Sequence, residues 1–155
     1  MSNTVMGIDV SKETLDVMLL DGKRRKEHAF RNNEKGFKSL VNWLEKQQSN
    51  QAHICLEATG RYSFPVTKYL YASTLKVSMV NPARIKYYRD SLFARNKTDR
   101  LDAYVIADFC RTQNPPLWVP STPEQEELKE LTRYLESMNQ MVHQEKNRLQ
   151  AGYSS

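Results

Sequence analysis

The sequence predicts an α/β domain built on a mixed sheet with flanking helices, followed by a long helix. Three observations lead to this prediction. Short apolar runs, such as residues 5–10 and 53–57, have the length and composition of buried strands. Between them, apolar residues recur at helical spacing. From residue 122 onward, apolar residues stand three or four positions apart in one continuous helical pattern.

The first three strands are expected to pair antiparallel through short turns. Residues 5–10 and 15–20 are apolar runs separated by a short polar segment. Asp21 and Gly22 then form a turn signal, because glycine tolerates the positive φ of tight hairpin turns. Residues 26–31 follow as the third predicted strand.

Helices and strands then alternate. The next helix is predicted by apolar residues at positions i, i+3, i+4 and i+7, which are Phe37, Leu40, Val41 and Leu44. Asn33 has a side chain suited to its N-cap. After it we expect a strand over residues 53–57, a helix over 62–71 and a strand over 75–80. This order of elements indicates a mixed sheet.

Two further helices are predicted towards the C-terminus. The first runs from about Asp99 to Thr112, before a pair of prolines. The second opens with a capping box formed by Thr122 and Gln125. Its apolar residues form a heptad seam at Leu128, Leu131, Leu135, Met138, Val142 and Leu149. The seam predicts a coiled coil or helical hairpin, and the alternative is a helix packed on its own domain.

Composition and charge exclude several classes of protein. Apolar residues make up 39% of the 155 residues and charged residues 26%, which fits a soluble protein with a packed core. No apolar run approaches the roughly 18–20 residues of a membrane span, and no secretory signal opens the chain. The net charge of 23 − 18 = +5 is compatible with a polyanionic partner.

The cysteines and histidines predict no metal site. Cys55 and Cys110 are far apart in the sequence, and His28, His53 and His143 have no ligand spacing. Two cysteines without a disulfide pattern indicate a reduced, cytoplasmic compartment.

Four carboxylates form the most informative pattern. Asp9 and Glu57 each end an apolar strand, where a charge is costly unless it is paired. Asp99 and Asp102 are three residues apart and share one face of the predicted helix. Because such a cluster repels itself, Mg²⁺ or Mn²⁺ is its natural counterion. A site of this kind catalyses phosphoryl transfer by activating the attacking oxygen and stabilising the leaving one.

Each acid also has an ordinary structural explanation. Asp9 and Asp99 can cap the turn or helix that follows them, Glu57 can pair with Arg61, and Asp102 can pair with an arginine. The joint pattern of all four favours the metal site.

Three other acids are set aside. Asp16 lies inside a predicted strand with no turn after it. Asp90 lies in a basic segment, where ion pairs are expected. Asp108 is turned away from Asp102 by about a third of the helix circumference.

Residues 83–100 form a basic segment that predicts contact with nucleic acid. Its cations are Arg84, Lys86, Arg89, Arg95, Lys97 and Arg100. Phosphates bind such side chains with release of counterions, and Lys12 beside Asp9 is a further candidate for a phosphate contact. Tyr87 and Phe93 can stack on unpaired bases, whereas Tyr88 is expected in the core. The alternative is a solvated helix face, with Lys12 an ordinary exposed turn lysine.

Three motifs resemble the DEDD transposases of bacterial insertion sequences, of the insertion-sequence-110 type and akin to Piv DNA invertases. They are Gly7-Ile8-Asp9-Val10-Ser11-Lys12, Glu57-Ala58-Thr59-Gly60 and Lys97-Thr98-Asp99-Arg100-Leu101-Asp102-Ala103, in the order of the family. The resemblance implies a RuvC-like catalytic domain of the RNase H fold over residues 1–120 and the start of a coiled-coil oligomerisation helix over 121–155. It also implies that Asp9, Glu57, Asp99 and Asp102 hold the catalytic metal.

The same resemblance implies that the chain is the N-terminal part of a longer recombinase. Family members have a second, C-terminal domain that provides a serine nucleophile, and nothing in this chain corresponds to it. DNA is the implied partner, together with a second copy of the chain bound through the last helix. The family is also similar to recombinases that use a bridge RNA, so a guide RNA is a further candidate partner.

Four functions are therefore weighed. The first is the metal-dependent catalytic domain of a DNA transposase, which cleaves and joins strands. A Holliday-junction-type RuvC-like nuclease is a close variant of it. A sugar-kinase or actin-like ATPase also starts with a Gly-Ile-Asp strand, but Ser11 and Lys12 replace its glycine-bearing phosphate turn. A non-catalytic fragment that binds nucleic acid and oligomerises would tolerate neutralisation of the four acids.

Overall fold

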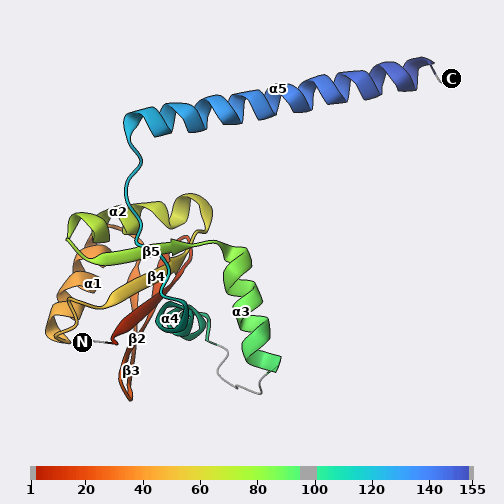
Figure 1. Ribbon diagram of the computed structural model, residues 1–155. Coiled ribbons are helices and arrows are strands. Elements are labelled where there is room, and N and C mark those ends of the chain that lie inside the picture. The colour runs from red at the N-terminus through yellow and green to blue at the C-terminus, as the bar shows by residue number, and fades with distance from the viewer. Residues whose placement is uncertain (1–2, 95–100, 154–155) are drawn as a thin grey trace. The chain divides into compact units, whose positions relative to one another are not determined.

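The computed structural model describes residues 3–94 and 101–153, which fall into two compact units, Met1–Val119 and Pro120–Ser155 (Figure 1). The strands of the first unit are β1 (Val5–Val10), β2 (Thr14–Asp21), β3 (Arg24–Arg31), β4 (His53–Glu57) and β5 (Lys76–Val80). Its helices are α1 (Glu34–Lys46), the 3₁₀ turn η1 (Gly60–Tyr62), α2 (Phe64–Ala72), α3 (Pro82–Ala94) and α4 (Asp102–Gln113). The second unit contains α5 (Pro123–Tyr153).

The five strands form one mixed sheet in the order β3-β2-β1-β4-β5. Antiparallel pairing joins β1 to β2 and β2 to β3, whereas β4 runs parallel to both β1 and β5. This arrangement confirms the predicted mixed sheet and its antiparallel start. The parallel strands β1 and β4 end at the same edge of the sheet, which becomes important for the site.

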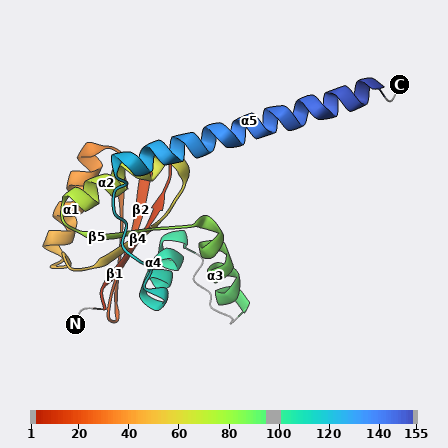
Figure 2. The ribbon, with the colours of Figure 1, turned by 45° about the horizontal axis from the view of Figure 1, so that its top comes forward.

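Helices cover both faces of the sheet (Figures 1 and 2). Because side chains alternate along a strand, Met6 and Ile8 of β1 face a core that also contains residues of α1 and α2. Val5 faces the opposite core, which contains Ile106 and Phe109 of α4. Each face of β1 is therefore buried, and polar residues of β1 are tolerated only near its end.

The helix α4 packs on β1 with its backbone in direct contact at Gly7. A Cβ added to Gly7 would lie 2.2 Å from the carbonyl oxygen of Ala103 and 2.4 Å from the amide nitrogen of Ala107. Both alanines are buried and stand one helical turn apart. The absence of a side chain at Gly7 thus fixes how closely the first turns of α4 approach the strand.

Local signals in the sequence are found in the structure. The Asn33 side chain accepts a hydrogen bond from the Gly36 amide at 2.9 Å and caps α1. Thr122 and Gln125 form the predicted reciprocal capping box, with bonds of 2.9 and 3.2 Å. Gly22 has a φ of 60° in the turn between β2 and β3.

One helix boundary differs from the prediction. The helix expected from Asp99 begins at Asp102, because Leu101 is extended, with φ −66° and ψ 126°. Asp99 itself lies outside the described residues. The expectation that Asp99 and Asp102 share one face of this helix therefore falls outside the described residues.

The helix α5 carries its apolar seam on an uncovered surface. Its residues Leu128, Leu131, Leu135, Met138, Val142 and Leu149 are between 44% and 63% exposed. Across residues 3–94 and 101–153, no helix is both long enough and apolar enough to span a bilayer.

Replacement of Gly7 tests the close approach of α4. We expect Gly7→Ala to lower the free energy of unfolding by about 1–3 kcal/mol, because backbone atoms of α4 must move away from the new methyl group. Urea titration followed by circular dichroism measures the loss. Gly152→Ala is the matched control, since an added Cβ there meets nothing within 4 Å. Equal stability of Gly7→Ala and the wild-type chain would contradict the packing described.

Candidate active site

Two predicted acids lie at the shared edge of β1 and β4, on the face covered by α4. Ile8 of β1 pairs with Leu56 of β4 in parallel register, so Asp9 and Glu57 are the next residues along the two strands. Asp9 stands two residues after Gly7 and Glu57 two residues after Cys55, so both point to the face that α4 covers. The parallel register thus places both carboxylates at the same edge and on the same face of the sheet.

Asp102, the first residue of α4, joins them. The helix lies on β1 at Gly7, two residues before Asp9, so its first turn stands beside the end of the strand. Asp102 is close enough to raise the pKa of both Asp9 and Glu57 by like-charge repulsion. The structure therefore brings together three of the four acids that the sequence singled out, and the fourth, Asp99, is outside the described residues.

The electrostatics of Asp9 show the cost of this arrangement. The pKa of Asp9 is raised from 3.8 to about 6, mainly by partial burial and then by the charges of Asp102, Asp16 and Glu57, against the opposing charge of Arg89. Burial also raises the pKa of Glu57; there Arg89 lowers it and Asp102 raises it. A bound cation would favour the charged forms of Asp9 and Glu57 and so lower both pKa values.

Asp16 is a neighbour that the sequence argument set aside. It pairs directly opposite Asp9 in the antiparallel ladder of β1 and β2. Opposed residues of a ladder point to the same side of the sheet, so its exposed carboxylate stands beside that of Asp9. The hairpin register contains the missing signal, because pairing Val10 with Leu15 across the turn places Asp9 opposite Asp16.

An open cleft of about 550 Å³ runs beside the acids. Asp9, Asp16 and Asp102 line it together with Glu27 and His28 of β3. The carboxylates are therefore accessible to a ligand from the side of β2 and β3.

Arg89 of α3 supplies a positive charge inside this acidic group. Its Nη2 lies 2.5 Å from Oδ1 of Asp102, and its Nε is buried with no hydrogen-bond partner in the described part of the chain. The pairing of Asp102 with an arginine, considered from the sequence, thus occurs. Arg61, considered as a partner of Glu57, instead donates to the Tyr62 hydroxyl at 3.3 Å.

The other basic candidates have different surroundings. Lys12 is exposed in the turn after β1, and Lys86 is exposed on α3. The Arg84 guanidinium lies 5.2 Å from the centre of the Phe109 ring, next to Tyr87, which is 80% exposed. Arg95, Lys97 and Arg100 lie outside the described residues.

Two residues set apart by the sequence analysis behave as expected. Tyr88 is partly buried and donates a hydrogen bond of 2.5 Å to Asp108. Asp108 is buried and also pairs with Arg111. These two partners balance the charge of Asp108, which lies apart from the acidic group around Asp9.

The donor set fits a hard divalent cation. Asp9, Glu57 and Asp102 offer only oxygen atoms, which Mg²⁺ and Mn²⁺ prefer. Burial first, and then repulsion from the neighbouring carboxylates, raises the pKa of Asp9, and a bound cation would favour its charged form.

Comparison with known proteins gives matches along most of the chain. Residues 6–152 match a family described as transposase, of the DEDD insertion-sequence-110 type. The pilin gene-inverting proteins of Moraxella bovis and Moraxella lacunata are each 34% identical over 153 residues. That alignment covers 97% of this chain and 48% of each relative, so the chain spans about half their length. Among solved structures, T. thermophilus RuvC in complex with a Holliday junction substrate is similar, with a TM-score of 0.47 and 13% identity over 67% of this chain and 89% of RuvC.

The raised pKa of Asp9 predicts a specific dependence of stability on pH. A carboxyl with a folded-state pKa near 6 contributes its full stability below about pH 4, and that contribution is lost as the pH rises through 6. In EDTA, we expect the wild-type chain to lose about 1 kcal/mol relative to Asp9→Asn across this window, after solvent screening is allowed for. Chemical denaturation at a series of pH values measures the difference, and parallel pH profiles for the two proteins would contradict it.

Proposed function

Because the chain belongs to the DEDD transposase family of the insertion-sequence-110 type, we propose that residues 1–120 are the metal-dependent catalytic domain of a DNA recombinase. The observation that carries this proposal is the convergence of Asp9, Glu57 and Asp102 from β1, β4 and α4 on one face of the sheet. Family membership implies a RuvC-like domain of the RNase H fold, and the mixed sheet agrees with it.

In the proposed site, Asp9, Glu57 and Asp102 hold Mg²⁺ or Mn²⁺, with Asp99 as the fourth acid of the family motif. The ion supplies charge stabilisation at a reacting phosphate and polarises its oxygens. Asp16 adds negative charge next to Asp9 and strengthens the attraction for a cation. Arg89 orients the Asp102 carboxylate through their ion pair.

DNA is the proposed substrate, held by exposed cations of the first unit. Lys12 follows β1 beside Asp9, and Lys86 and Arg84 project from α3, so all three are available for phosphate contacts. The relatives that invert pilin genes suggest cleavage and joining of DNA strands as the complete reaction. We also propose a guide RNA as a second nucleic-acid partner. The proposed compartment, in which the protein would bind both nucleic acids, is the cytoplasm.

The helix α5 is proposed as the site of self-association. Its exposed seam repeats at heptad spacing, and burial of such a seam against a second copy removes apolar surface from water. Two copies would then present two catalytic domains to DNA ends.

Charge placed in the seam tests this association. We expect Leu135→Glu to shift the chain to monomer, because the carboxylate would be buried in the helix interface. Gln140→Glu adds the same charge elsewhere on the helix and should leave the assembly unchanged. Sedimentation equilibrium measures both. A wild-type monomer at micromolar concentration, or equal assembly of the two variants, would contradict the proposal.

The catalytic proposal is tested with the full-length protein and DNA that carries the ends of its element. We expect Asp9→Asn and Asp102→Asn to lower the rate of strand cleavage at least about a hundredfold, since a lost metal ligand costs more than a lost outer partner. DNA binding, measured in parallel, should persist. Asp90→Asn is the matched control, because Asp90 is exposed on α3 outside the acidic group. Cleavage at the wild-type rate in both site variants would favour the non-catalytic binding fragment.

A further inference from the structure

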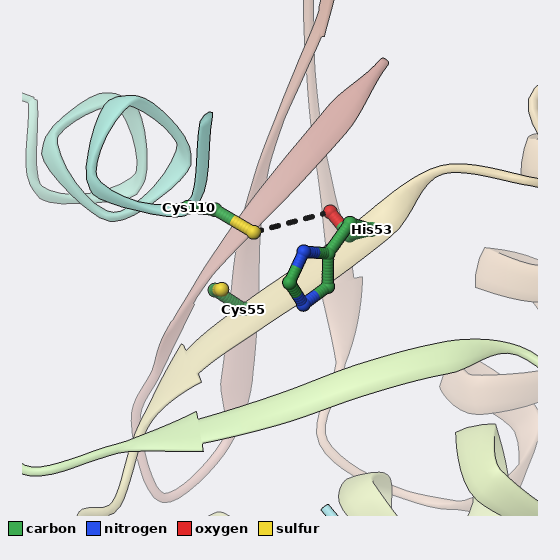
Figure 3. Close-up of side chains that lie close together, drawn as sticks. All are labelled: His53, Cys55 and Cys110. Atoms are coloured by element: carbon green, nitrogen blue, oxygen red, sulfur yellow. Dashed lines mark hydrogen bonds between the residues drawn. The ribbon is translucent and has the colours of Figure 1, made fainter. Parts of the chain in front are cut away.

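A second group of metal-binding side chains lies between β4 and α4. His53 and Cys55 are two residues apart on β4 and therefore face the same side, towards Cys110 of α4 (Figure 3). One ring nitrogen and the two sulfur atoms all lie within 4.8 Å of one another. The sequence suggested no relation between these residues, because 55 positions separate the two cysteines.

Burial sets the two thiols apart from ordinary surface cysteines. Cys55 is 0% and Cys110 is 1% exposed, and neither forms a disulfide. The Cys110 thiol donates to the backbone oxygen of His53 at 3.4 Å, as the dashed line in Figure 3 shows. Buried cysteines often act only as small apolar residues, so the case for a site depends on the imidazole.

The hydrogen bonds around His53 select the tautomer that a metal requires. Nε2 lies 2.7 Å from the Ser78 hydroxyl oxygen, and that hydroxyl donates to the carbonyl oxygen of Pro115 at 3.3 Å. Since the serine proton is used on Pro115, the serine oxygen accepts from His53, and Nε2 carries the ring proton. Nδ1 then has a lone pair, and it is the ring nitrogen on the side of Cys110 in Figure 3. Ligand histidines are held in this way by a partner on the other nitrogen.

A route from solvent reaches the same imidazole. A surface groove of about 420 Å³ is lined by His53 together with Lys76, Asn114 and Pro115. An ion can therefore enter at the half-buried ring without passing through the core, and a water molecule in the groove can complete its coordination.

We propose that His53, Cys55 and Cys110 bind one thiophilic d¹⁰ cation of the zinc class through Nδ1 and two thiolates. Binding releases the two thiol protons to solvent. A tetrahedral ion with Zn–S bonds of about 2.3 Å holds its ligand atoms about 3.8 Å apart. The present spacing needs movements of about one ångström at most.

The proposed ion is chemically distinct from the one at the acidic site. Sulfur and imidazole nitrogen select zinc-like ions, whereas the oxygens of Asp9, Glu57 and Asp102 select Mg²⁺ or Mn²⁺. The sulfur site joins β4 to α4, the elements that also supply Glu57 and Asp102. It would act as a structural clamp that stabilises the packing of α4 on the sheet.

Cobalt(II) substitution tests the site, because a thiolate-to-cobalt charge-transfer band arises only from bound sulfur. We expect the reduced chain to bind one equivalent of Co²⁺ with this band and to release it to Zn²⁺. Zn²⁺ should also raise the temperature of unfolding, since the three ligands are held together only in the folded chain. Asp9→Asn, which removes a carboxylate from the other site, should leave the band unchanged.

Variants then assign the ligands. Cys55→Ser and Cys110→Ser should weaken Co²⁺ binding at least tenfold and reduce the band, and Ser78→Ala should weaken it about tenfold to a hundredfold through the tautomer of His53. A folded wild-type chain with two reactive thiols and no band would overturn the proposal, and this result needs no variant. A band undiminished in Cys110→Ser, or a Cys55–Cys110 disulfide found in place of the thiols, would overturn it as well.

Discussion

The close approach of α4 to β1 at Gly7 is the constraint on which the rest of the structure depends. Backbone atoms of Ala103 and Ala107 occupy the space where any other residue would have a Cβ. This contact sets the height of α4 above the sheet and so the position of Asp102 beside the end of β1. Without it, the acids of the strands and the acid of the helix would belong to separate surfaces. A glycine two residues before Asp9 is thus as much part of the site as the carboxylates are.

The same packing creates an electrostatic cost that points to function. Burial, together with carboxylates from three other elements, raises the pKa of Asp9 to about 6 in spite of the nearby Arg89. If stability alone had determined the sequence, we would expect an apolar residue or a paired charge at position 9. A bound divalent cation, as we propose for this site, would make the arrangement favourable, and the chain's membership of a transposase family is in keeping with that proposal. Arg89 lowers part of the cost through its ion pair with Asp102.

Local sequence signals predicted the elements, and spatial relations required the structure. The strand over residues 53–57 and the caps at Asn33 and Thr122 follow from patterns within a few residues. Asp9 and Glu57 were identifiable because each ends an apolar run. Asp16 was not, because its role as neighbour depends on the register of β1 against β2. Contacts such as those of Arg89 with Asp102, or among His53, Cys55 and Cys110, join segments whose separation no local pattern encodes.

The central claim is that strand-end and helix acids form one cation site, and Mn²⁺ binding tests it most directly. Electron spin resonance counts free Mn²⁺ during titration of the purified chain, and oxygen ligands favour this ion over the thiol group. The account predicts a bound class of Mn²⁺ that is lost in Asp9→Asn and equally in Asp102→Asn, but retained in Asp90→Asn. Binding that survives loss of either acid, or its absence from the wild-type protein even with DNA present, would contradict the account.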